Sequence, residues 1–193
     1  MSGGDTAAGP TPGIGHNGGP SMEPGFGWRR HAWARARAEL MPHLPLEVVR
    51  RRVARAKDLG LPYRTYAGIR ASTGRDVIGF LFSTNALRML RAGALPPPEV
   101  AERLGAIRGA ARIGLARPPV AQEALAALMD AAHPAPRPFA PWAEARAGVT
   151  AALEGRPGDA VVLVGDTAEE RLWAEAGRLA HYLGAEAYFG AGA

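Results

Sequence analysis

Residues 77–82 read Val-Ile-Gly-Phe-Leu-Phe, and residues 160–164 read Ala-Val-Val-Leu-Val. Each stretch is a short, nearly unbroken apolar run, which is typical of a β-strand buried on both faces. A helix is expected after each run, beginning at Ala86 in the first case and after Thr167 in the second. Strands that alternate with helices in this way favour an α/β fold with a small parallel, Rossmann-like sheet.

Weaker patterns complete this predicted sheet. A further strand is expected at residues 111–116 and an edge strand at residues 187–189. Helices are expected at 99–107, 120–131 and 142–153, with a proline-rich turn over 133–141. Apolar residues at helical spacing extend the helix after Thr167 as far as residue 183: Leu172, Ala176, Leu179, Ala180 and Leu183.

The composition divides the chain into three segments. Residues 1–27 are rich in Gly, Pro, Ser and Thr, and their few apolar residues have no period, so a disordered leader is predicted. Residues 28–75 predict a basic helical region, with one helix ending before Pro42 and two more at 46–59 and 63–71. In the predicted helix at 46–59, the buried face consists of Leu46, Val49, Val53 and Ala56, and arginines form the outer face. Residues 76–193 form the predicted α/β core.

Positive charge is concentrated in one part of the chain. Residues 28–91 contain fourteen Arg and Lys against four Asp and Glu, a net charge of +10, whereas the whole chain carries +5. Clustered like charge destabilises a fold unless a polyanion neutralises it, so we expect nucleic acid or an acidic protein as partner. A solvated arginine-rich face is the alternative, because the preference for Arg over Lys is typical of a GC-rich genome.

Residues 56–70 resemble a helix-turn-helix unit. Ala56, Gly60 and Ile69 have its spacing, with a small residue at the helix crossing, Gly in the turn and an apolar residue on the second helix. An ordinary helical hairpin is the alternative, and Gly68 within the second helix favours it. The buried contacts would come from Leu59, Leu61 and Tyr66. The residues expected to meet nucleic acid are Arg50, Arg51, Arg52, Arg55, Lys57, Arg64, Thr65 and Arg70, of which Arg64, Thr65 and Arg70 would project outward from the second helix.

Polar residues follow both strong strands, at the sheet edge where doubly wound folds bind phosphate or magnesium. The run Gly165-Asp166-Thr167, with Glu170, Ala174 and Gly177 behind it, resembles the last motif of the haloacid-dehalogenase-like hydrolases. Ser83-Thr84-Asn85 resembles the phosphate-binding Thr/Ser motif of the same family. The resemblance implies a phosphate or nucleotide site with Mg²⁺, formed by Ser83, Thr84, Asn85, Asp166 and Thr167.

The chain lacks the Asp-x-Asp that carries the nucleophile of that family. Without a phosphoryl acceptor, binding without turnover is expected at this site, or a degenerate site. Thr167 and Glu170 also have the spacing of a capping box, so a helix start is the alternative reading of these residues. A second resemblance covers residues 13–20, Gly-Ile-Gly-His-Asn-Gly-Gly-Pro, which are similar to a leader of alphaproteobacterial and phage-related proteins and indicate lineage only.

Several functions have no support in the sequence. The absence of Cys excludes disulfides and thiol chemistry, and the five His lack metal-ligand spacing. No nucleophile, dinucleotide or Walker motif is present, so we expect a protein that is not an enzyme and carries no cofactor or metal outside the Mg²⁺ alternative. No apolar run approaches a membrane span and no signal-peptide pattern is seen, so a cytoplasmic location is expected.

Overall fold

The computed structural model describes residues 44–190, so the predicted leader and the first predicted helix lie outside the described residues. Within the described part, five parallel strands form one sheet in the order β3-β2-β1-β4-β5. The strands are β1 (Gly79–Ser83), β2 (Ala111–Ala116), β3 (Ala131–Pro134), β4 (Val161–Gly165) and β5 (His181–Gly184). The predicted α/β class with a parallel, Rossmann-like sheet is confirmed.

The two apolar runs form the central pair of strands, β1 and β4. In β1, Phe80 and Phe82 pack into one hydrophobic core, while Leu81 packs into the core on the opposite face. In β4, Val162 and Leu163 divide between the two cores in the same way. An unbroken apolar sequence is therefore required, because each strand contributes side chains to both cores.

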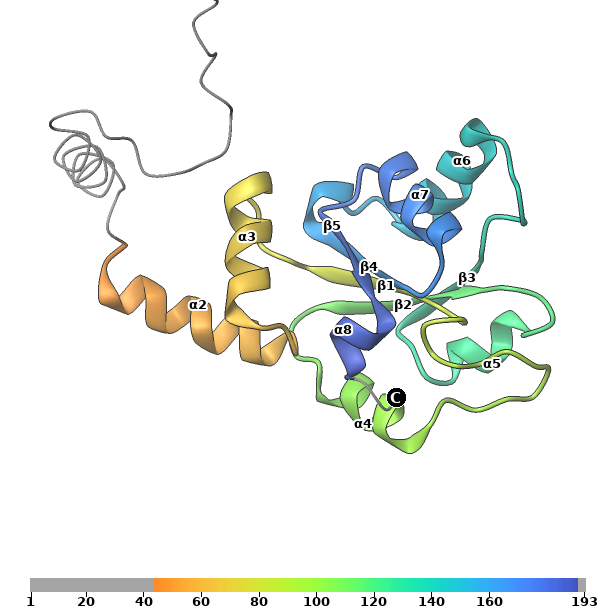
Figure 1. Cartoon of the computed structure of the whole chain (residues 1–193), viewed down its shortest axis with the longest axis horizontal. Helices are drawn as coiled ribbons and strands as arrows, with labels where there is room; N and C mark the ends of the chain where they lie inside the picture. Colours follow the sequence, from red (N-terminus) through yellow and green to blue (C-terminus); the bar gives the residue numbers. More distant parts are fainter. Residues whose placement is uncertain (1–43, 191–193) are drawn as a thin grey trace, which may run out of the picture. The chain divides into compact units, whose positions relative to one another are not determined.

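Helices cover both faces of the sheet (Figure 1). The helices α6 (Trp142–Ala152) and α7 (Ala168–Ala176) pack on the face of Leu81. The opposite core receives side chains from the remaining helices, which are α2 (Leu46–Asp58), α3 (Tyr63–Thr73), α4 (Pro98–Ala106), α5 (Gln122–Ala126) and α8 (Ala185–Phe189). A short 3₁₀ turn, η1 (Gly158–Ala160), leads into β4.

The helical pair α2 and α3 belongs to the same compact unit as the sheet. Gly60 connects the two helices in the left-handed region, at a φ of 66°, which favours glycine. The hydroxyl of Tyr188 in α8 donates a hydrogen bond to the carbonyl of Leu59 at 3.0 Å. All the residues predicted to lock the crossing are buried, namely Ala56, Leu59, Leu61, Tyr66 and Ile69. The predicted burial of these residues is therefore confirmed, and all five belong to the core that covers one face of the sheet.

The predicted buried face of α2 is wrong for all but its last turn. Leu46 and Val53 are 61% and 47% exposed, and only Ala56 of the predicted stripe is buried. The reason is that α2 contacts the core through its last turn, whereas its earlier turns extend beyond the sheet (Figure 1).

Three predictions for the segments that follow or flank the strands are also wrong. Residues 84–88 form a turn and not the start of a helix, because Arg88 takes a left-handed backbone with a φ of 59° and ends the helical path after one turn. The predicted helix reaching residue 183 ends at Ala176, and β5 follows. The predicted edge strand at 187–189 lies in α8, and β3 lies at the boundary of the predicted proline-rich turn. These segments are too short for periodicity to separate helix from strand.

Candidate functional site

A concave surface between α2 and α3 gathers most of the positive charge of the helical pair. Its volume is about 320 Å³, and it lies beside the amino end of β1. The polar residues lining it are Arg51, Arg52, Arg55, Tyr66, Arg70 and Asp76. We call this surface the arginine pocket. Four guanidinium groups therefore face a single carboxylate among its lining residues.

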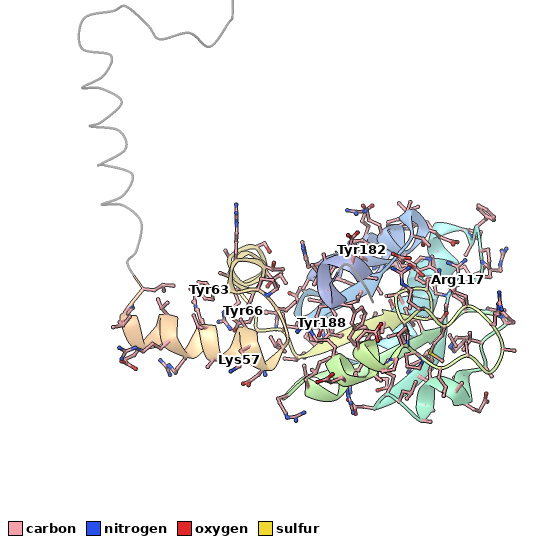
Figure 2. The ribbon with its side chains drawn as sticks, turned by 60° about the horizontal axis from the view of Figure 1, so that its bottom comes forward. Lys57, Tyr63, Tyr66, Arg117, Tyr182 and Tyr188 are labelled. Carbon is pink, nitrogen blue, oxygen red and sulfur yellow. The ribbon has the colours of Figure 1, made fainter. Side chains whose placement is uncertain are left out.

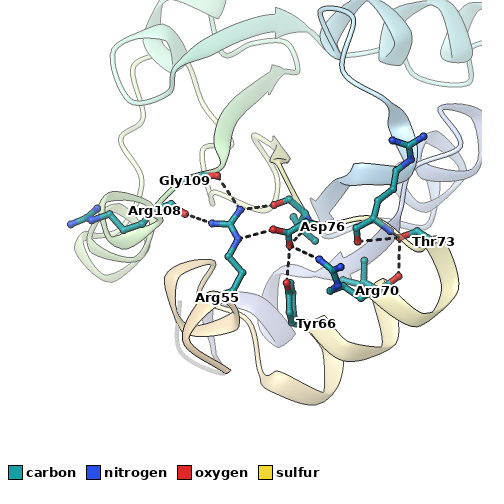
Figure 3. Close-up of polar contacts among 10 residues, drawn as sticks. Arg55, Tyr66, Arg70, Thr73, Asp76, Arg108 and Gly109 are labelled. Carbon is teal, nitrogen blue, oxygen red and sulfur yellow. Dashed lines mark hydrogen bonds and ion pairs between the residues drawn. The ribbon is translucent and has the colours of Figure 1, made fainter. Parts of the chain in front are cut away.

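Asp76 connects three of these side chains (Figure 3). Its Oδ2 accepts a hydrogen bond from Arg55 Nε at 3.1 Å, and its Oδ1 accepts one from the Tyr66 hydroxyl at 2.8 Å. Arg70 Nη1 lies 3.7 Å from the same Oδ1. Burial and the Asp76 carboxylate together raise the pKa of Tyr66. The sequence interpretation missed Asp76, although an acid directly before an apolar strand in a basic segment was the available signal.

Arg55 joins α2 to the amino edge of the sheet (Figure 3). Its Nη2 donates to the carbonyls of Val77 at 2.8 Å and Gly109 at 3.0 Å, and its Nη1 donates to the carbonyl of Arg108 at 3.1 Å. These carbonyls precede β1 and β2, so one guanidinium holds a helix and two strand ends together. The prediction that Arg55 belongs to the outer arginine face is therefore wrong.

The other residues predicted to contact nucleic acid differ in whether their side chains already have an ion-pair or hydrogen-bond partner within the chain. Arg50 pairs with Glu47 at 2.7 Å on the exposed side of α2, and Arg70 turns toward Asp76, although an outward position was predicted for it. Thr65 is half-buried. Four cationic side chains have no ion-pair or hydrogen-bond partner among residues 44–190: Arg51, Arg52, Lys57 and Arg64. Lys57 is exposed in the last turn of α2 and is labelled in Figure 2.

The predicted phosphate residues lie at the opposite edge of the sheet. Because β1 and β4 pair directly, Ser83 to Asn85 and Asp166 to Thr167 follow neighbouring strand ends, as the sequence predicts. Ser83 and Thr84 are buried, and both hydroxyls already accept a backbone hydrogen bond, from Ala86 at 3.1 Å and from Arg117 at 3.2 Å. Because both side chains are also buried, neither hydroxyl is exposed to a ligand.

A fully buried carboxylate, that of Glu170, fills the loop after β4. Its Oε2 accepts hydrogen bonds from the amides of Asp166 at 2.6 Å and Thr167 at 3.0 Å, and its Oε1 accepts one from Asn85 Nδ2 at 2.9 Å. Thr167 Oγ1 accepts from the Glu170 amide at 3.2 Å, which confirms the capping box. The amides that would cradle a phosphate at this loop already bind an internal anion.

The charged side chains beside this loop are also paired with one another. Asp166 Oδ2 lies 3.0 Å from Arg88 Nη1, and Arg117 Nη1 lies 2.9 Å from Glu169 Oε2. The guanidinium of Arg117 also stacks over the buried ring of Trp173 at 5.4 Å. Figure 2 shows Arg117 at the end of the sheet away from α2. The two candidate sites are therefore at opposite edges of the same sheet.

Over residues 44–190, no three His, Asp or Glu side chains are arranged so that they could hold a metal ion. No helix in that same range is long and apolar enough to cross a membrane. Comparison with protein-family models, with curated proteins and with solved structures found no match.

Proposed function

We propose that this protein binds nucleic acid through the arginine pocket and the basic surface around it. The observation that carries the proposal is the convergence of Arg51 and Arg52, which have no partner among residues 44–190, with two arginines that share the single carboxylate of Asp76. Over residues 44–75, eight Arg and Lys stand against two Asp and Glu, so the charge of this surface is not balanced locally. A polyanion is the partner that such a surface favours.

The chemistry of the pocket suits a phosphodiester. A guanidinium presents several N–H donors in a planar fork that matches two phosphate oxygens. Asp76 fixes Arg55 and Arg70 in place, while Arg51 and Arg52 retain their donors for a ligand. Lys57 and Arg64 are two further exposed cations on the same helices, outside the pocket lining.

This surface has little capacity to read base sequence. The exposed positions of α3 include Arg64, Gly68, Ala71 and Ser72, of which only Arg64 is long enough to reach far into a groove. Phosphate contacts fix position without carrying sequence information. We therefore infer an accessory or regulatory role with weak sequence preference, and an acidic protein is the competing partner.

A phosphate- or nucleotide-binding function at the carboxyl edge is the second candidate. Its support is the position of Asp166 and Thr84 at the point where the strand order reverses, between β1 and β4, where open α/β sheets bind ligands. We favour the nucleic-acid function because the Glu170 carboxylate already occupies the loop amides and Arg88 already pairs with Asp166.

The test is fluorescence anisotropy of a labelled single-stranded oligonucleotide and of its duplex, titrated with the protein at salt concentrations from about 50 to about 200 mM. The logarithm of the affinity should fall linearly with the logarithm of the salt concentration, by about 0.7 to 0.9 per phosphate contacted. R51Q and R52Q should each weaken binding and lower this slope by roughly one contact.

The matched control is R91Q, which removes the same charge from an exposed arginine in the loop after β1, at the other edge of the sheet. This variant should bind like the wild type. Absence of binding even at the lowest salt contradicts the proposal and leaves an acidic protein as the partner to seek. Equal affinities for R51Q, R52Q and R91Q contradict the role given to the arginine pocket.

A further inference from the structure

A second basic hollow lies at the amino edge of the sheet, beside η1 and the last turns of α6 and α7. Its volume is about 370 Å³, and its charged lining residues are Arg146, Arg156, Asp159 and Arg178. We call it the edge hollow. Arg146 and Arg178 lie outside the basic segment 28–91, so the charge pattern along the sequence gave no signal for this surface.

The edge hollow holds more positive charge than its own neighbours neutralise. Asp159 is its one carboxylate among the lining residues, and its Oδ2 already pairs with Arg75 Nε at 2.9 Å. Arg156 pairs with Glu154 at 2.8 Å. The side chains of Arg146 and Arg178 have no partner among residues 44–190. Two guanidinium groups are therefore left for an external anion.

Helix ends offer a simpler reason for arginines in this place, because the last carbonyls of a helix carry partial negative charge. Arg156 fits that reason, since its Nη1 donates to the carbonyl of Leu153 at 3.2 Å near the end of α6. Within the described residues, Arg146 and Arg178 donate to no such carbonyl. Arg146 moreover lies in the first half of α6, so the helix-end explanation does not apply to it, and Arg178 keeps its donors for a ligand.

The backbone of Arg178 is a separate observation. Arg178 follows Gly177 at the end of α7 with a φ of 50°, in the left-handed region where glycine is the favoured residue. Its position is tightly fixed, because a Cβ on Gly158 would lie 2.9 Å from the carbonyl oxygen of Arg178. Local stability therefore favours glycine at position 178, and strained residues of this kind cluster at functional sites.

The two basic surfaces meet at residues 75 and 76. Asp76 lines the arginine pocket, and the neighbouring Arg75 pairs with Asp159, which lines the edge hollow. Consecutive Cα atoms are about 3.8 Å apart, so the two surfaces lie on either side of one short stretch of backbone. Asp76 and the Arg75–Asp159 ion pair therefore lie at the junction of the two basic surfaces.

We propose that a nucleic-acid strand held in the arginine pocket continues across Arg75 into the edge hollow, where Arg146 and Arg178 neutralise a second group of phosphates. This inference rests on the proposed function and adds a path to it. The strand would run along the amino edge of the sheet, the opposite edge from the one that open α/β folds commonly use for ligands.

The test uses R146Q, R178Q and R178G in the anisotropy titration described above, with R91Q as the control of equal charge. Each of the three variants should lower the salt slope by about 0.7 to 0.9, which corresponds to about five- to eightfold weaker binding at about 0.1 M salt. R178G separates binding from folding, because it relieves the left-handed strain. We expect it to be more stable than the wild type in urea and yet to bind more weakly.

The outcomes distinguish this inference from the proposed function. If R51Q weakens binding while R146Q, R178Q and R178G bind like R91Q, the path into the edge hollow is wrong and the function of the arginine pocket stands. If the wild-type protein binds no oligonucleotide, both proposals are wrong. If R178G is more stable and binds several-fold more weakly, the path is supported and loss of folding is excluded as the cause.

Discussion

Replacing Arg55 by alanine separates an arginine that holds the fold from those proposed to hold a ligand. The wild-type guanidinium bonds Asp76, the Val77 carbonyl and two carbonyls before β2. Alanine removes all four hydrogen bonds and loosens α2 from the sheet. Arg51→Ala, one turn earlier on the same helix, removes the same charge from a side chain without a partner among the described residues.

The size of the change in unfolding free energy depends on how buried each of the four hydrogen bonds is. The bonds to Asp76 and the Val77 carbonyl are partly buried, and a hydrogen bond to a charged group contributes about 1.5 kcal/mol or more. The two bonds to the carbonyls before β2 are exposed, so water replaces them at little cost. We therefore expect Arg55→Ala to lower the free energy of unfolding by about 3 kcal/mol, and Arg51→Ala to change it by less than about 0.5 kcal/mol.

Urea unfolding followed by circular dichroism measures both variants, and thermal scans check the result. For a protein of this size, 3 kcal/mol corresponds to a Tm lower by roughly 6 to 12 °C. Arg55→Lys should recover only part of the loss, because one ammonium cannot reach four acceptors in different directions. Equal unfolding free energies for Arg55→Ala and Arg51→Ala would refute the structural role of Arg55.

Two further predictions concern stability. Gly158→Ala should lower the unfolding free energy by about 1 to 3 kcal/mol, because the new Cβ would lie 2.5 Å from the Gly177 carbonyl oxygen. Gly68→Ala should raise the unfolding free energy by about 0.5 to 1 kcal/mol, because Gly68 lies in α3 with open space around it. The pair is compared by urea unfolding, and a Gly158→Ala protein as stable as the wild type contradicts the close backbone approach. Partial desolvation of the largely exposed His181 imidazole, with a smaller effect of Arg171, lowers the pKa of His181 below 6.5. The unfolded chain therefore takes up a proton first, and stability should fall as the pH drops through 6.5 toward the folded pKa. His181→Gln should flatten the unfolding free energy across that pH window, and an unchanged pH profile contradicts the assignment.

The central sheet was predictable because one physical requirement acts on each of its strands. Val161 to Val164 alternate between two cores, and this demands an unbroken apolar run that is visible without the fold. The edge strands were harder to predict for the opposite reason. In β5, Leu183 packs against one core while His181 is exposed, and the same residues also fit the continuation of a helix. The left-handed backbone of Arg178, at a φ of 50°, ends α7, and no glycine at position 178 indicates this turn in the sequence.

The positive charge of the candidate site could be predicted from the sequence, but the arrangement of its side chains could not. The sequence indicates a basic segment, and the structure places Arg51 and Arg52 in a concave surface within it. Nothing in the spacing shows that Arg55 turns inward, because its carbonyl partners before β2 are more than fifty residues away along the chain. Arg178 was missed for the same reason, since it joins the basic surface only through the fold.

The most direct measurement is the pattern of backbone amide shifts in an NMR titration of the ¹⁵N-labelled protein with a short single-stranded oligonucleotide. If a strand binds along the amino edge, shifts should appear in α2 and α3, at residues 75–76 and around Arg178, with little change at Ser83 to Asn85 and Asp166 to Glu170. Shifts concentrated in the loops after β1 and β4 would contradict it and favour a site at the carboxyl edge. No shift at any residue at low salt would contradict nucleic-acid binding altogether.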